Sequence, residues 1–139
     1  MAEVLLGMRL VPEFSPYIFE RGSVESGSAA ERAGALMDFY RDDSIKAVFD
    51  ISGGDIANGI LPYLDYGVIA DSDKQFWGYS DLSTVLNAIY AKTGKSSVLY
   101  QICNLLYEHG EEQRKNFQST ILGEGKELFT FPCDFLQGK

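Results

Sequence analysis

The sequence predicts an α/β fold in which a parallel sheet is flanked by helices. Short apolar runs rich in β-branched and aromatic residues alternate along the chain with segments of helical spacing. The 139 residues, 45% of them hydrophobic, are enough to bury one core as a single domain. Strands that alternate with helices form βαβ units, whose strands are parallel and covered on both faces. We therefore expect three layers, of the flavodoxin-like or Rossmann-like kind.

The first third of the chain contains the clearest helix signal. Residues 1–6 read as the end of a helix, and residues 8–14 as a short strand that Pro12 places at a sheet edge. From Ser28 to Arg41, apolar residues recur at the spacing of one helix face. Glu31 stands three residues after Ser28, which is the pattern of a capping box. A helix is therefore expected to begin at Ser28.

Two strand, turn and helix units are expected to follow. Residues 47–51 (AVFDI) read as a strand that ends in a glycine turn, followed by helical spacing from Ile56 to Leu64, with Pro62 as a kink or an end. Residues 75–78 (QFWG) read as a second strand, followed by a sharp turn and a helix that ends at Gly94. A strand over residues 97–102 and a polar helix over 111–122, with Phe117 on its apolar face, complete the pattern.

The composition excludes several classes of function. A formal charge of −8 disfavours nucleic acid and anionic membrane surfaces, because both require clustered Lys and Arg. Cys103 and Cys133 are far apart, so neither a disulfide framework nor a metal motif is expected, and free thiols suit a reducing, cytoplasmic compartment. The first ten residues carry no basic leader or long apolar run, so no membrane segment is expected. No cofactor and no metal are expected.

Two turns at expected strand ends could carry chemistry, because active groups of such sheets collect at the carboxyl ends of the strands. The first is residues 52–55 (SGGD), whose glycines would let backbone N–H groups approach an oxyanion. The second is residues 78–81 (GYSD), which makes Ser80 the candidate nucleophile. Leu82 stands where the G-x-S-x-G elbow pattern has its second glycine, and on the pattern alone a helix cap is the commoner role for Ser80.

Residues 29–94 resemble the amino-terminal domain of the serine LD-carboxypeptidases, which include the microcin C self-immunity peptidases. The resemblance lies in the order and spacing of AAERAGALMDFYRDDSIKAVFDISGG, LPYLDYGVI and FWGYSDLSTVLNAIYAKTG. It implies a peptidase that removes a terminal D-amino acid from murein-type peptides. Carried onto this chain, it implies that Ser80 is the nucleophile and that the N–H groups of Asp81 and Gly54 form the oxyanion hole. It also implies substrate contacts from Gly53 and Asp55 at the glycine turn. Tyr79, an aromatic residue next to Ser80, is expected to line a substrate pocket. The Asp81 carboxylate is expected to cap the helix that follows it or to orient the turn.

The sequence departs from this family in two ways. The glycine turn often reads Arg-Gly-Gly-Tyr-Gly in the family, and here it reads SGGDI, which puts its substrate contacts in doubt. The family also takes its catalytic Glu and His from a carboxyl-terminal domain. We therefore expect residues 1–139 to be the nucleophile-bearing domain alone, truncated at both ends and nearly inactive as a fragment. Surface left uncovered by the second domain could then drive dimerisation.

Other residues have simpler interpretations. His109 lies in a polar turn and is expected to be a solvated loop residue, while Trp77 and Tyr100 are expected in the core. Asp50 and Asp55 flank the glycine turn but lack a metal-ligand pattern. Two rival functions stay open: a non-catalytic module that binds a peptide carboxylate through the backbone N–H groups of the two turns, and a flavodoxin-like domain that binds a phosphate ligand at the glycine turn.

Overall fold

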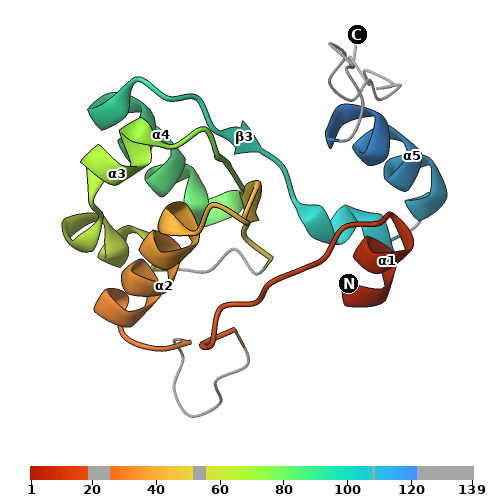
Figure 1. Ribbon diagram of the computed structural model, residues 1–139, viewed down its shortest axis with the longest axis horizontal. Coiled ribbons are helices and arrows are strands. Elements are labelled where there is room, and N and C mark those ends of the chain that lie inside the picture. The colour runs from red at the N-terminus through yellow and green to blue at the C-terminus, as the bar shows by residue number, and fades with distance from the viewer. Residues whose placement is uncertain (19–25, 52–55, 108, 122–139) are drawn as a thin grey trace, which may run out of the picture. The chain divides into compact units, whose positions relative to one another are not determined.

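The computed structural model describes residues 1–18, 26–51, 56–107 and 109–121, and it divides into two compact units. One unit spans Pro12–Ile102 and contains the sheet, and the other comprises Met1–Val11 and the chain from Cys103 onward. Figure 1 shows the path of the chain through both units. The parallel α/β fold that the sequence predicts is confirmed.

The sheet consists of three short parallel strands in the order β1-β2-β3. They are β1 (Ala47–Phe49), β2 (Gln75–Gly78) and β3 (Val98–Leu99). In the register, Phe49 faces Trp77, and Gly78 faces Leu99. Because all three strands run the same way, their carboxyl ends lie at one edge of the sheet, where the turns into the following helices begin.

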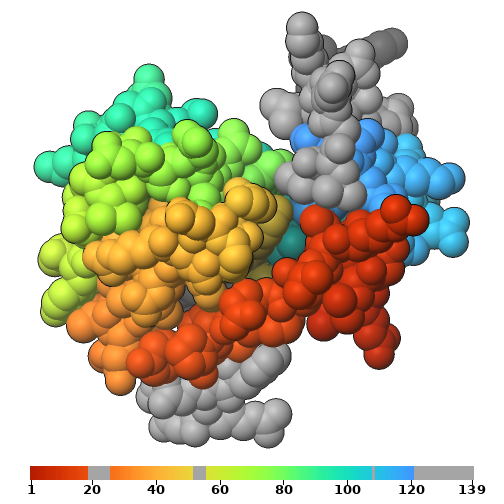
Figure 2. Space-filling model, in the orientation of Figure 1, coloured from red at the N-terminus to blue at the C-terminus, as the bar shows by residue number. Residues whose placement is uncertain are grey.

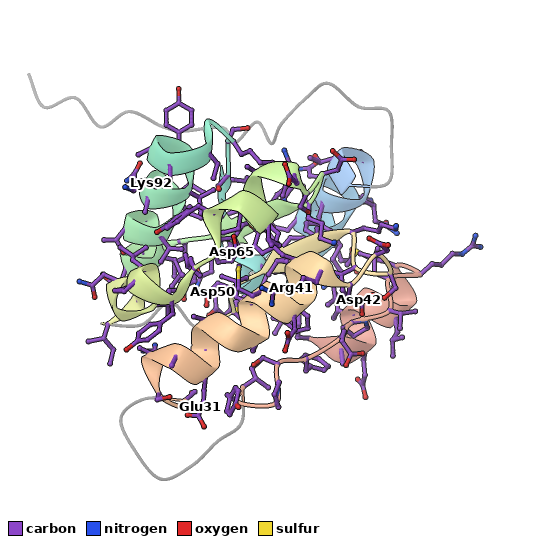
Figure 3. All side chains as sticks on the ribbon, turned by 60° about the vertical axis from the view of Figure 1, so that its left-hand side comes forward. Glu31, Arg41, Asp42, Asp50, Asp65 and Lys92 are labelled. Atoms are coloured by element: carbon purple, nitrogen blue, oxygen red, sulfur yellow. The ribbon has the colours of Figure 1, made fainter. Side chains whose placement is uncertain are left out.

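Helix α2 (Ala29–Arg41) begins with the predicted capping box. The Ser28 hydroxyl accepts a hydrogen bond from the Glu31 N–H at 3.3 Å, and the Glu31 carboxylate accepts one from the Ser28 N–H at 2.8 Å. Hydrogen bonds from the Ser28 side chain and backbone lower the pKa of Glu31. Figure 3 shows Glu31 and Arg41 at opposite ends of this helix, and α2 lies on the surface in the space-filling view (Figure 2).

The capping box predicts a measurable effect on stability. Ser28→Ala removes an acceptor that no other group replaces at the start of α2, so the free energy of unfolding should fall by about 1 kcal/mol. Urea denaturation followed by circular dichroism measures it. Ser26→Ala changes an exposed serine two residues earlier and is the matched control. Equal midpoints for the two variants would contradict the role of Ser28.

The remaining helices of this unit connect the strands. The 3₁₀ helix η1 (Ala57–Tyr63) and α3 (Tyr66–Asp71) lie between β1 and β2, and the 3₁₀ turn η2 (Ser80–Leu82) leads from β2 into α4 (Ser83–Thr93). Helix α4 ends at Gly94, whose φ of 72° is left-handed, which confirms the predicted end.

One hydrophobic core joins these elements to one face of the sheet. Val48 of β1 and Phe76 of β2 contribute from the strands, and the helices contribute Ala33, Leu36, Met37, Tyr40, Ala57, Ile60, Leu64, Ile69, Leu82, Val85, Leu86 and Ile89. Successive strand residues point to opposite faces, so Trp77 lies on the other face from Phe76. There it contacts Phe49 and Tyr100, with ring centroids 5.3 and 5.8 Å away. The expectation that Trp77 and Tyr100 are core residues is confirmed.

The other unit contains α1 (Ala2–Gly7) and α5 (Gly110–Ile121), together with most of the 3₁₀ helix η3 (Ile102–Leu106). Phe117 of α5 is fully buried, as its place on the apolar face predicts. The Arg114 guanidinium donates to the Leu105 carbonyl at 2.8 Å and fixes the turn before α5. No helix among the described residues has the length and apolar character needed to cross a bilayer.

Three sequence-based expectations need correction. Residues 8–14 are not a strand, because Pro12 cannot donate to a ladder and Arg9 turns the chain with a φ of 63°. The helix expected after the glycine turn is a 3₁₀ helix that ends at Tyr63, next to Pro62. The strand expected over residues 97–102 is ordered as a strand only at Val98 and Leu99.

Helix α3 was not predicted. Its signal is Asp65, whose carboxylate accepts hydrogen bonds from the Gly67 and Val68 N–H groups at 3.1 and 3.2 Å. Asp65 also lies 3.9 Å from the Arg41 guanidinium, and both side chains are exposed (Figure 3). Such an exposed pair contributes little, so the cap is the main reason that the helix begins there.

Candidate active site

The carboxyl-terminal edge of the sheet brings the ends of all three strands together. The ladder continues one residue beyond the strands, because the Asp50 N–H donates to the Trp77 carbonyl and the Tyr100 N–H donates to the Gly78 carbonyl, each at 2.8 Å. Strand β2 is thus hydrogen-bonded through the Trp77 carbonyl on the β1 side and through the carbonyl of Gly78, its last residue, on the β3 side. Ser80 lies two residues further along the chain and is exposed.

Ser80 has the backbone conformation of a nucleophile elbow. Tyr79 is extended, with φ −150° and ψ 176°, and Ser80 then has a φ of 56° in the left-handed region. A serine in this region carries a backbone strain of about 1–2 kcal/mol, so the surrounding turn must hold it there. The Leu82 N–H closes the turn by donating to the Tyr79 carbonyl at 3.1 Å. Only Tyr79 separates Ser80 from β2, and the short turn η2 that begins at Ser80 leads directly into α4, so Ser80 lies in a tight strand-to-helix turn.

Ser80 does not cap the helix that follows it. The N-cap position of α4 is Leu82, and no side chain at that position bonds to the first turn. Within the part of the chain that the structure describes, no hydrogen bond occupies the Ser80 hydroxyl. Its oxygen is therefore available for another role, which weakens the helix-cap interpretation of this motif.

The leucine that breaks the usual elbow pattern is accommodated by Gly78. Leu82 is buried, and a Cβ atom added at Gly78 would lie 3.1 Å from the Leu82 Cβ. The two positions flank the serine and approach each other closely. Because Gly78 has no side chain, the Leu82 side chain fits beside it and is buried in the core, and a second glycine at position 82 is not needed for the turn.

Asp81 connects the Ser80 turn to the start of η1. Its carboxylate Oδ2 accepts a hydrogen bond of 2.8 Å from the N–H of Ala57, the first residue of η1. The expectation that this carboxylate caps the helix after its own turn needs correction, because the helix that it caps is η1. The Asp81 N–H is the second of the 3₁₀ turn and has no partner within that turn, and its expected oxyanion role stays a prediction.

The other predicted site residues divide into two groups. Gly53, Gly54 and Asp55 lie outside the described residues, so the oxyanion and substrate roles expected of them stay predictions. Tyr79 is described: it is half-buried and directly precedes Ser80, but no contact assigns it to a substrate. Among the described residues, no group of His, Cys, Asp and Glu could hold a metal ion.

His109 is a turn residue, as expected. It is exposed and has a φ of 63°, at the entrance to α5. Glu111 and Glu112 are exposed in the first turn of α5, and Asp42 ends α2 with its carboxylate accepting from the Ser44 N–H at 2.8 Å. These acidic groups thus belong to helix ends.

A parallel α/β sheet that ends in a strained, exposed serine before a helix defines the class of α/β proteins with a nucleophile elbow. The comparison with known families identifies the group within that class. Residues 1–100 match the model of the LD-carboxypeptidase N-terminal domain, so the chain belongs to the LD-carboxypeptidase family.

Relatives from several bacteria share this match. The chain is 41% identical over 69 residues to a putative carboxypeptidase of Vibrio cholerae and to the microcin C7 self-immunity protein MccF of Escherichia coli. It is 38% identical over 69 residues to a probable murein peptide carboxypeptidase of Bacillus subtilis. Each alignment covers 50% of this chain but only 20–22% of the relative.

Solved structures agree with the sequence matches. The apo structure of MccF superimposes with a TM-score of 0.78 and 26% identity, covering 94% of this chain and 41% of MccF. An MccF-like protein of Bacillus anthracis has a TM-score of 0.63 and 38% identity, covering 67% of this chain and 28% of that protein. The chain therefore spans less than half the length of the relatives it matches.

Proposed function

We propose that this chain is the nucleophile-bearing part of a serine LD-carboxypeptidase and that Ser80 is its nucleophile. The observation that carries the proposal is the left-handed φ of Ser80 in the turn from β2 to the following helix, which is the place and conformation of the serine in a nucleophile elbow. The exposure of Ser80 supports the same role, as does the absence of a hydrogen bond to its hydroxyl from the residues that the structure describes.

In the proposed reaction, the Ser80 oxygen attacks the carbonyl carbon of a peptide bond, and the hydroxyl proton passes to a general base. The carbonyl oxygen becomes an oxyanion that the Asp81 N–H stabilises, with the Gly54 N–H as the expected second donor. The C–N bond then breaks, the leaving amine takes up the proton, and water releases the acyl group from Ser80. A Glu and a His from outside this chain are the proposed source of the base.

Two substrate classes follow from the relatives. The Bacillus subtilis relative is named a probable murein peptide carboxypeptidase, which supports a peptide ending in a D-amino acid. Solved MccF structures hold aspartyl sulfamoyl adenosine and glutamyl sulfamoyl guanosine, which supports an aminoacyl-nucleotide conjugate. We favour the murein-type peptide, because the family resemblance of residues 29–94 implies that substrate class.

Labelling with a fluorophosphonate probe tests the proposal on the complete gene product. The wild type should be labelled, and Ser80→Ala should lose labelling and hydrolyse a D-alanine-terminated murein tetrapeptide at least about 10³-fold more slowly. Ser96→Ala, which changes an exposed serine beyond the far end of α4, is the matched control and should behave as the wild type.

The outcomes separate the candidate functions. Labelling that persists in Ser80→Ala would exclude Ser80 as the nucleophile. A folded wild type that is not labelled, but binds the tetrapeptide through its carboxylate, would replace the peptidase with the non-catalytic binding module. Cleavage of an aminoacyl sulfamoyl nucleoside but not of the tetrapeptide would change the substrate class and leave the role of Ser80 intact.

A further inference from the structure

The side chain next to the proposed nucleophile binds a distant part of the chain. Asp81 lies 24 residues after Ala57, and its half-buried carboxylate accepts the Ala57 N–H at 2.8 Å. Ala57 begins η1, where the described chain resumes after the glycine turn. This hydrogen bond therefore joins the starts of the two helical segments that follow β1 and β2.

Residue 56 shows why the acceptor must come from elsewhere. The N-cap position of η1 is Ile56, whose apolar side chain cannot accept a hydrogen bond, although this position normally provides the acceptor. Without Asp81, the Ala57 N–H would be buried beside an apolar core with no acceptor from its own cap. Ala57 and Leu82 are both buried in that core, so η1 and η2 also meet through apolar side chains.

We infer that the Asp81 carboxylate is a positioning group: by accepting the Ala57 N–H it ties the Ser80 turn to the start of η1, and so holds the Asp81 N–H where the oxyanion forms. The inference rests on the proposed function of Ser80. Asp81 would then have two roles: its N–H stabilises the oxyanion, and its carboxylate holds the Ser80 turn against the start of η1. Donors act only when they are held near the position of the developing charge, so a loosened turn should slow the chemical step without weakening substrate binding.

Three variants of the complete gene product test this role. Asp81→Ala removes the acceptor, and the rate of fluorophosphonate labelling and kcat should each fall roughly 10- to 100-fold, with KM little changed. Asp81→Asn keeps an amide oxygen that can accept from Ala57, and it should restore most of the rate. Asp65→Ala removes a carboxylate cap of the same kind at α3 and should leave the rate unchanged.

Hydrogen exchange at the Ala57 amide provides a readout that does not depend on chemistry. Exchange should be faster in Asp81→Ala than in the wild type and unchanged in Asp65→Ala. If Asp81→Ala does not fold, Asp81→Glu, which keeps the charge but moves the acceptor outward by one methylene, should show the same two effects in weaker form.

The outcomes distinguish the two levels of the proposal. A wild type that labels at Ser80, together with an Asp81→Ala variant as fast as Asp65→Ala, would overturn the positioning role alone. Unchanged exchange at Ala57 in Asp81→Ala would overturn the tether itself. A wild type that is not labelled would overturn the proposed function of Ser80. The hydrogen bond from Ala57 to Asp81 could then still be detected by hydrogen exchange, but it would have no role in catalysis.

Discussion

Substituting valine for Gly78 should lower the free energy of unfolding by about 2–3 kcal/mol and abolish labelling of Ser80. A Cβ atom at this position would lie 3.1 Å from the Leu82 Cβ and 3.7 Å from a terminal methyl carbon of Leu86. The first distance is shorter than ordinary van der Waals contact, and the two methyl groups of valine add further overlap. Strand β2 and α4 can separate only by moving the elbow between them, so stability and reactivity should fall together.

Gly34→Ala is the matched control for Gly78. Gly34 lies inside α2, is exposed, and has nothing within 4 Å of an added Cβ. Alanine is the better helix former there, so this substitution should raise the free energy of unfolding by about 0.5–1 kcal/mol. Urea denaturation of both variants measures the two changes in the free energy of unfolding, which should have opposite signs. A Gly78→Val protein as stable as the wild type would show that the elbow does not depend on this close approach.

The elements that could be predicted from the sequence are those specified by neighbouring residues. The capping box of Ser28 and Glu31 places the start of α2, and Gly94 places the end of α4, because each signal is complete within one helical turn. Ser80 could be selected as the candidate nucleophile because a turn between a β-rich run and a helical pattern is also local. The family resemblance of residues 29–94 then agreed with the match to the family model.

The features that escaped prediction depend on contacts between distant residues. The hydrogen bond from Ala57 to Asp81 spans 24 positions. The close approach of Leu82 to Gly78, which leaves no room for a side chain at residue 78, exists only once the turn has folded. Residues 8–14 have the composition of a strand, but a strand also needs a neighbour to pair with. Helix α3 is the exception, since the cap at Asp65 is local and could have been recognised.

Two buried tyrosines should make the protein sensitive to alkali. Tyr40 is 4% exposed and Tyr100 is 7% exposed, and burial raises the pKa of each from 10.0 to about 12. Burial disfavours the phenolate, so the folded state holds these protons at a pH where the unfolded chain has released them. The stabilisation is fully present below pH 10.0 and is lost as the pH rises toward about 12.

The expected loss is comparable with the stability of a small domain. A shift of about two pKa units corresponds to about 2–3 kcal/mol for each tyrosine, or about 5 kcal/mol together, which is comparable with the whole stability of a small domain. Denaturant titrations between neutral pH and pH 12, with tyrosinate formation followed by ultraviolet absorbance, measure this loss. Tyr40→Phe should remove about half of it while changing stability little at neutral pH, because no ionisation is involved there. If Tyr40→Phe and the wild type lost stability in parallel across this range, the phenolate of Tyr40 would not be the cause, and water would have to reach its hydroxyl in the folded state.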